Sequence, residues 1–242
     1  MPLRIITDLV TMRVIIPNNL KIFVRLFTSL LILSMCLFTV VRGWSITHFA
    51  EARARLLSGT AGADALRPWV GVPGLTGPAL ESSLAVVSAE DTDVARRRRS
   101  DDLVALLSVR PLSSANWLSL AANWQERSRH APDVEGALSM SSLTGPNEGS
   151  LMWRRAVFGL LHWETLSEEA HGRTTTDLAG AMLGHVLVGD EVTLAGRLLS
   201  HKSSETRARI AAMLRGAGLP AAELTQLGLP GDAPDAEAAP PP

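Results

Sequence analysis

The longest apolar run of the chain lies near its N-terminus, where residues 26–41 carry no charge. Residues 22–25 extend it to 20 residues if Arg25 places its guanidinium among the lipid headgroups. A helix of that length spans the hydrocarbon core of a bilayer. Trp44 follows at the position of an aromatic interface residue. We therefore predict one transmembrane helix over residues 22–42.

A permanent signal anchor is favoured over a cleaved signal peptide. The first A-x-A cleavage pattern, at residues 50–52, lies about nine residues beyond the apolar run, which is far downstream for a signal peptidase site. A lipoprotein signal needs a small residue before its cysteine, whereas Met35 precedes Cys36. Cleavage remains the alternative. A buried core helix is the least favoured interpretation, because no other part of the chain is so continuously apolar.

Basic residues flank the apolar run on both sides, with a small excess before it. Lys21 and Arg25 lie close to its N-terminal end, and Arg42 lies at the other. This asymmetry favours a cytoplasmic N-terminal tail over residues 1–21. Arginine strongly outnumbers lysine, a bias typical of GC-rich bacterial genomes. We therefore expect a bacterial inner-membrane protein with a single span and a periplasmic C-terminal domain.

After the span, the pattern of apolar and polar positions predicts only helices, with no strand pattern. Residues 43–78 are expected to form a juxtamembrane helix followed by a linker rich in Gly and Pro. Residues 230–242 hold no large apolar side chain and are expected to be a disordered acidic and Pro-rich tail. The domain over 79–229 is expected to contain helices near 79–88, 92–108, 113–129, 133–142, 149–166, 174–187, 190–200, 204–216 and 220–227.

Capping residues mark several of these helix starts. Ser113 follows Pro111 and can cap the helix of residues 113–129. Asp190 can cap the helix of residues 190–200. Thr174 and Asp177 have the spacing of a capping box. The adjacent acids after Ser167, at 168 and 169, have the character of a first helical turn, where the helix dipole favours negative charge.

Two tryptophans share one face of the helix that follows Pro111. Trp117, Leu120, Ala121 and Trp124 fall at i, i+3, i+4 and i+7. The helix around Trp153 is apolar on two sides, which predicts neighbours on two sides. Short helices of this kind, joined by tight turns, form stacked arrays because one hairpin alone cannot cover its core. These five residues are the predicted core of such a stack.

The segment "PLSSANWLSLAANW" resembles the first helix of a tetratricopeptide repeat. Pro146 follows Pro111 by 35 residues, against a nominal period of 34. The match weakens afterwards, because Ser128 stands where Gly is usual, Asp133 where Ala is usual, and the next aromatic residue is shifted to Trp153. The resemblance covers residues 92–166 and implies an all-α, α-solenoid-like stack of antiparallel helices, like that of the tetratricopeptide family. A groove lined by the first helices, around Asn116, Asn123 and Arg127, is the partner-binding surface that we predict.

The whole chain also resembles uncharacterised single-pass membrane proteins of rhizobia that are found with exopolysaccharide genes. That resemblance rests on no diagnostic motif. It implies a place in polysaccharide biosynthesis or export at the cell envelope.

Charge and composition do not indicate a nucleic-acid partner. The net charge is −1, and the single cysteine, Cys36, excludes an internal disulfide and a multi-cysteine metal site. The run Arg96–Arg99 is bracketed by acids, and Asp93–Arg97, Arg97–Asp101 and Arg98–Asp102 are i, i+4 pairs on a helix. A solvated, salt-bridged face is therefore favoured over a site for acidic lipid or anionic polysaccharide.

No arrangement of side chains specifies a reaction. The six histidines are scattered without metal-ligand spacing, and the chain holds neither a G-x-S-x-G elbow nor a phosphate-binding loop. No catalytic residue, cofactor or metal is predicted. The favoured function is a non-enzymatic, membrane-anchored module that binds unidentified protein partners. The alternative is a helical envelope enzyme acting on glycan or peptidoglycan, with Glu164 or Glu148 as its acid in a cleft.

Overall fold

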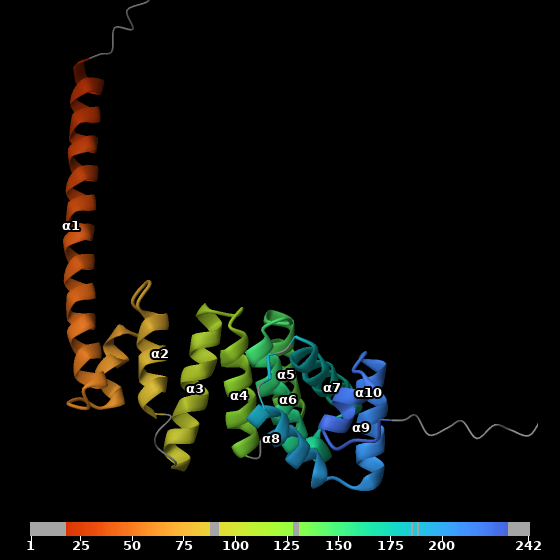
Figure 1. Ribbon diagram of the computed structural model, residues 1–242. Coiled ribbons are helices and arrows are strands. Elements are labelled where there is room, and N and C mark those ends of the chain that lie inside the picture. The colour runs from red at the N-terminus through yellow and green to blue at the C-terminus, as the bar shows by residue number, and fades with distance from the viewer. Residues whose placement is uncertain (1–17, 88–91, 128–130, 185, 188, 232–242) are drawn as a thin grey trace, which may run out of the picture. The chain divides into compact units, whose positions relative to one another are not determined.

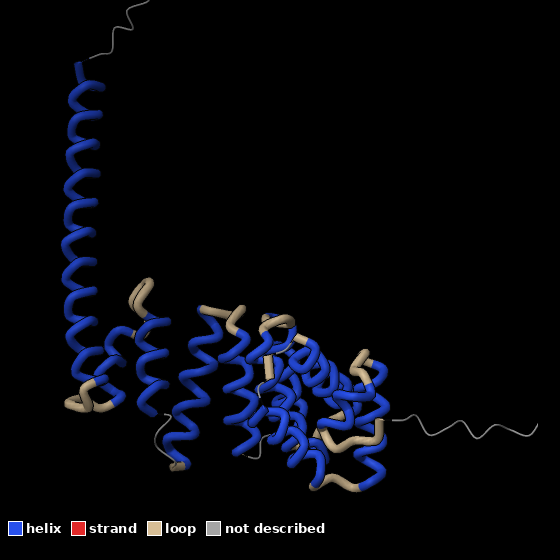
Figure 2. The backbone as a smooth tube through the Cα atoms, viewed as in Figure 1, coloured by secondary structure: helices blue, strands red, loops and turns tan. Residues whose placement is uncertain are grey.

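The computed structural model describes residues 18–87, 92–127, 131–184, 186–187 and 189–231. Every regular element in these residues is a helix, and no strand occurs among them. The fold is all-α, as predicted, with one apolar helix at its N-terminus (Figures 1 and 2). The chain divides into two compact units, residues 1–55 and 56–242.

The first unit is built on α1 (Asn18–Leu57), a single uninterrupted helix of 40 residues. Its part from Ile22 to Leu57 is long and apolar enough to cross a membrane. At 1.5 Å per residue, α1 is about 60 Å long, twice the ~30 Å of a hydrocarbon core. The predicted span over 22–42 and the predicted juxtamembrane helix are therefore one element, without a break after Arg42.

Hydroxyl side chains within the apolar part of α1 bond to the backbone of their own helix. Thr28 Oγ1 donates to the carbonyl of Val24, and Thr39 Oγ1 donates to that of Met35 at 2.8 Å. A hydroxyl satisfied in this way is less costly to place in hydrocarbon, where no water can bond to it. Near the end of the run, the Trp44 and His48 rings contact edge to face at 4.4 Å between centroids.

The second unit contains two short 3₁₀ helices and nine α-helices among its described residues. The 3₁₀ helices are η1 (Ala63–Trp69) and η2 (Trp163–Thr165). The α-helices are α2 (Thr76–Val87), α3 (Asp93–Val109), α4 (Ser114–Glu126), α5 (Ala131–Thr144), α6 (Gly149–Leu161), α7 (Glu168–Leu183), α8 (Gly189–Ser200), α9 (Ser204–Gly216) and α10 (Ala221–Gln226). Most match the predicted ranges to within a turn. The predicted linker carries η1 and the first turn of α2, and it buries Leu66.

The helices from α4 to α9 pack in two rows. Helix α4 packs on α5, and α6 packs on α7. In one row α4 contacts α6, which contacts α8; in the other, α5 contacts α7, which contacts α9. Two successive hairpins therefore lie against each other, and the third pair of helices continues both rows.

Helices α6 and α7 approach closely because a glycine faces a threonine. A Cβ atom at Gly159 would collide with the side chain of Thr174. The Thr174 hydroxyl donates to the carbonyl of Ala170 at 2.8 Å, inside α7. The prediction that Thr174 caps a helix is therefore wrong, because α7 begins six residues earlier, at Glu168.

The start of α7 is capped by Ser167, the residue before its two acids. Ser167 Oγ accepts a hydrogen bond from the Ala170 backbone N–H at 3.4 Å. Ser113 is the N-cap residue of α4, but its side chain makes no capping bond. Asp190 lies inside the first turn of α8 and not at its cap. The predicted tail lies almost wholly outside the described residues, as do the first 17 residues.

Candidate partner-binding surface

An apolar groove of about 320 Å³ runs between helices α4, α6 and α8. We call it the α4–α6–α8 groove. Its lining residues are Leu118, Ala122, Trp153, Arg154, Val157, Phe158, Leu161 and Leu194. The volume is at the lower end of the ~300–1,000 Å³ of ligand pockets. The groove therefore suits a few side chains of a larger partner.

One stripe of α6 supplies the centre of this groove. Trp153, Val157 and Leu161 recur at i, i+4 and i+8, so they lie above one another on the helix. Their exposed fractions rise along the stripe, from 8% at Trp153 to 55% at Leu161. The second apolar side of α6, which the sequence predicts to be covered by a neighbour, is thus only partly covered. Its open end is an unpaired apolar surface.

The predicted core residues of the stack lie between helices rather than at the surface. Leu120 and Ala121 are buried, and Leu120 packs with Leu103 and Leu107 of α3. The Trp117 and Trp124 rings pack against the clusters on both sides of α4. Of the three predicted indoles, Trp153 alone lines the groove.

Both indole N–H groups of α4 have hydrogen-bond partners. Trp124 Nε1 donates to Ser100 Oγ at 2.7 Å, which ties α4 to α3. Trp117 Nε1 donates to the Pro111 carbonyl at 2.8 Å. These bonds fix the rings as packing elements between helices.

The polar residues predicted to bind a partner do not line the groove. Asn123 is only 2% exposed, so the expectation that it lies on the surface is wrong. Asn116 and Arg127 are half-buried. The reason is that these three residues fall on one stripe of α4 with the buried Leu120, and α4 has neighbours on several sides. Neither amide atom of Asn123 has a hydrogen-bond partner within the described part of the chain.

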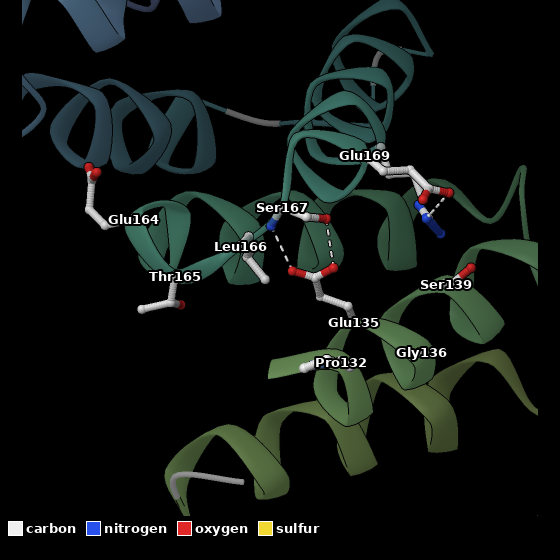
Figure 3. A pocket seen from close by; sticks show the side chains of 10 residues that line it. Pro132, Glu135, Gly136, Ser139, Glu164, Thr165, Leu166, Ser167 and Glu169 are labelled. Carbon is white, nitrogen blue, oxygen red and sulfur yellow. Dashed lines mark hydrogen bonds and ion pairs between the residues drawn. The ribbon is translucent and has the colours of Figure 1, made fainter. Parts of the chain in front are cut away.

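A second groove, of about 660 Å³, lies between α5 and the segment that joins η2 to α7 (Figure 3). The Glu135 carboxylate spans it and accepts hydrogen bonds from the backbone N–H and the hydroxyl of Ser167, both at 2.6 Å. Glu135 is thus occupied in holding the start of α7 against α5. On the side of the groove formed by α7, Glu169 pairs with Arg173.

Glu164, the predicted acid of the enzyme alternative, lies at the edge of this second groove. Its side chain is 70% exposed, and its Oε1 lies 3.6 Å from Lys202 Nζ. In Figure 3 it points away from the Glu135 carboxylate. Burial lowers the pKa of the neighbouring His162, and Lys202 adds to that shift. Glu148 is exposed too, so neither glutamate occupies the enclosed, convergent site that a general acid requires.

A buried ion pair joins α6 and α7. Arg155 is 1% exposed, and its Nε and Nη2 atoms donate to the two carboxylate oxygens of Asp177 at 2.8 and 2.7 Å. Arg155 Nη1 donates to the Gly145 carbonyl at 3.1 Å and lies 3.4 Å from Ser114 Oγ and the Ser141 carbonyl. Burial raises the pKa of Asp177, and the Arg155 guanidinium opposes that shift. One guanidinium thus joins four successive helices of the stack.

The four consecutive arginines of α3 are largely engaged with groups of the chain itself. Arg98 pairs with Asp102 at i+4, as predicted, at 3.9 Å. Asp93 instead pairs with Arg96 at i+3, at 2.8 Å, and this bond lowers the pKa of Asp93. Arg99 donates to the Val87 carbonyl at 3.1 Å. This pairing favours the structural interpretation of the run over an anion-binding site.

Asp102 is the buried member of this charged cluster. Its side chain is 2% exposed, and its Oδ1 lies 3.1 Å from Arg67 Nη2 of η1. Burial raises the pKa of Asp102, while Arg67 and Arg98 oppose the shift. Asp64 pairs with Arg98 at 2.7 Å and completes the link between η1 and α3.

Within the described residues, no group of three His, Cys, Asp or Glu side chains could hold a metal ion. His171 is buried, stacks on the Trp163 ring at 3.8 Å between centroids, and lies 2.7 Å from the Trp163 carbonyl through Nε2. Because a carbonyl only accepts, Nε2 carries the proton. His130 and His185 lie outside the described residues.

Comparison of this chain with protein families, with curated proteins and with solved structures finds no match. The function is therefore inferred from the geometry described above.

Sequence reasoning missed two features of this geometry. The first is the burial of Arg155, which looks like a surface residue beside Arg154 and falls on neither apolar face of α6. The second is the opening of the stripe at Leu161. A sequence signal for the open stripe was present, because the α6 sequence has more apolar surface than one neighbouring helix can cover.

Proposed function

We propose that this chain is a non-enzymatic, membrane-anchored helical scaffold that binds a partner protein through the α4–α6–α8 groove. The observation that carries the proposal is the open apolar stripe of α6, at whose end Leu161 is 55% exposed. An apolar concavity between helices is the kind of surface on which protein segments dock. The repeated pairing of α4 with α5 and of α6 with α7 supports a tetratricopeptide-like stack as its frame.

Helix α1 supports the anchoring part of the proposal. It supplies one segment long and apolar enough to cross a bilayer. We propose an inner-membrane anchor with the second unit in the periplasm, as the distribution of basic residues favours. A place in polysaccharide biosynthesis or export is supported by the resemblance to the rhizobial membrane proteins. Protease accessibility in spheroplasts tests the orientation, and secreted polysaccharide in a deletion strain tests the pathway.

Site-specific photocrosslinking in the native bacterium tests the partner-binding proposal. A benzophenone amino acid replaces Leu161 in the full-length protein, and a matched variant carries it at Leu143 of α5. Leu143 is 72% exposed and does not line the groove. We expect a discrete crosslinked species from position 161 and none from position 143. Equal crosslinking at both positions, or none at 161, would overturn the proposal.

A further inference from the structure

The α4–α6–α8 groove has one charged residue in its lining, Arg154. Its side chain is exposed, and no carboxylate within the described part of the chain comes within 4.0 Å of it. By contrast, Arg155 pairs with Asp177, and Arg173 pairs with Glu169. Arg154 therefore lies beside an open apolar surface without an ion-pair partner among the described residues.

The second groove offers no comparable feature. Its central carboxylate, Glu135, accepts two bonds from Ser167, and its guanidinium, Arg173, pairs with Glu169. Charged groups that are already paired within the chain offer a ligand few new hydrogen bonds or ion pairs. The combination of exposed aliphatic surface with a free charge is what sets the α4–α6–α8 groove apart from it.

We infer that the segment occupying the α4–α6–α8 groove is an acidic amphipathic segment of another protein, with aliphatic side chains on Val157 and Leu161 and a carboxylate on Arg154. This inference rests on the proposed function and names the chemistry of the partner. Burial of aliphatic side chains supplies the affinity, because the groove is apolar along α6. The guanidinium supplies selectivity, since a charge at the rim discriminates between partners more than it tightens binding. Arg also binds carboxylates in a two-pronged geometry that Lys cannot reproduce.

Selection of peptides on the intact protein tests this inference. The bait is the full chain in nanodiscs of a zwitterionic phospholipid, and the probes are random 14-residue peptides displayed on phage. Clones whose binding is lost in Leu161→Asn, a polar variant that adds no charge to the groove, are scored as groove binders. Among them we expect acidic residues to exceed basic ones by about two- to fivefold at low ionic strength, falling towards parity as salt screens the charge.

A charge reversal gives the decisive comparison. Selection on Arg154→Glu is expected to reverse the preference, so that groove binders become enriched in Lys and Arg. Arg97→Glu is the matched control, because Arg97 is exposed on α3 and does not line the groove; it should leave the acidic preference unchanged. Circular dichroism establishes that all three variants are folded.

Three outcomes of the peptide selection would overturn the inference. In the first, the groove binders show no preference between acidic and basic residues. In the second, the acidic preference is the same in Arg154→Glu as in the native chain. In the third, the library yields no clone whose binding depends on Leu161. A fourth is self-association of the chain that Arg154→Glu abolishes, because the occupant would then be a second copy. If any of these accompanies a crosslink at position 161 in the native bacterium, the inference fails while the proposed function stands. If the crosslink is absent as well, the proposed function fails with it.

Discussion

Arg155 of α6 donates two parallel hydrogen bonds to the carboxylate of Asp177 of α7, at 2.8 and 2.7 Å, in an environment that leaves the guanidinium 1% exposed. Removing one member of such a pair leaves the other charged and buried without compensation. We expect Arg155→Met to lower the free energy of unfolding by about 3–5 kcal/mol. The measurement is urea denaturation followed by circular dichroism.

The neighbouring Arg154→Met is the control for this variant. Its side chain is exposed, so its effect should stay within about 0.5 kcal/mol. Equal stability of the two variants would show that the buried pair does not hold α6 and α7 together.

The contact between Gly159 and Thr174 predicts a steric cost. A Cβ at Gly159 would collide with Thr174, so Gly159→Ala should separate α6 from α7 and destabilise the fold by about 1–3 kcal/mol. Apart from the backbone of its own helix and its two chain neighbours, Gly136 of α5 has no atom within 4 Å of the position its Cβ would take. Gly136→Ala should therefore stabilise by about 0.5–1 kcal/mol through helix propensity alone. Thermal unfolding distinguishes these opposite signs, and a destabilising Gly136→Ala would contradict the packing described here.

The two serine N-caps of α4 and α7 should respond differently to substitution. Ser167 caps the Ala170 N–H and binds Glu135, whereas the Ser113 side chain makes no capping bond. We expect Ser167→Ala to cost about 1–2 kcal/mol and Ser113→Ala to be close to neutral. Chemical denaturation measures both, and a larger effect at Ser113 would show that the capping geometry is wrong.

The raised pKa of Asp102 predicts how the stability of the fold depends on pH. Burial raises its pKa above the 3.8 of an unperturbed aspartate, so between those two values the folded chain binds more protons at this site than the unfolded chain. The contribution of Asp102 to the free energy of unfolding is therefore lost as the pH rises from 3.8 through the raised pKa. Above the raised pKa, this contribution no longer changes with pH. The difference in unfolding free energy between the native chain and Asp102→Asn should fall across this window. The comparison with Asp133→Asn, which removes an exposed acid of α5 that does not shift the pKa of Asp102, isolates the buried site.

A difference that grows with pH in that window would contradict the raised pKa. Arg67→Met supplies a further check, because Arg67 opposes the shift. Its loss should raise the pKa of Asp102 further and widen the window towards higher pH.

The sequence predicts the helices well because their signals are local. The apolar run of α1, the Gly and Pro residues between helices and the face shared by Trp117 and Trp124 depend on neighbours a few residues away. The start of α7 shows the limit, since Thr174 and Ser167 both have capping chemistry nearby. What separates them is the close approach of Gly159 to Thr174, a contact between two helices.

The partner-binding residues could not be predicted in the same way. Whether Asn123 or Leu161 faces solvent depends on which side of each helix its neighbours cover. Helical periodicity names the faces of α4 and α6 but does not say which face is left open. The burial of Arg155 likewise required knowing that Asp177, 22 residues away, lies opposite it.

The adjacency of Arg154 and Arg155 has a consequence for the tolerance of this region to insertions. Consecutive helical positions are rotated by about 100°, so one guanidinium faces solvent while the next reaches the interior. A one-residue deletion before α6 would move Arg155 to the exposed position of Arg154 and Ala156 to the buried position, leaving Asp177 without its partner and turning the stripe of Trp153, Val157 and Leu161 away from the groove. Length changes in the turn before α6 are therefore constrained by both the interior and the exterior of the same helix, and substitutions should be accepted there far more readily than added or deleted residues.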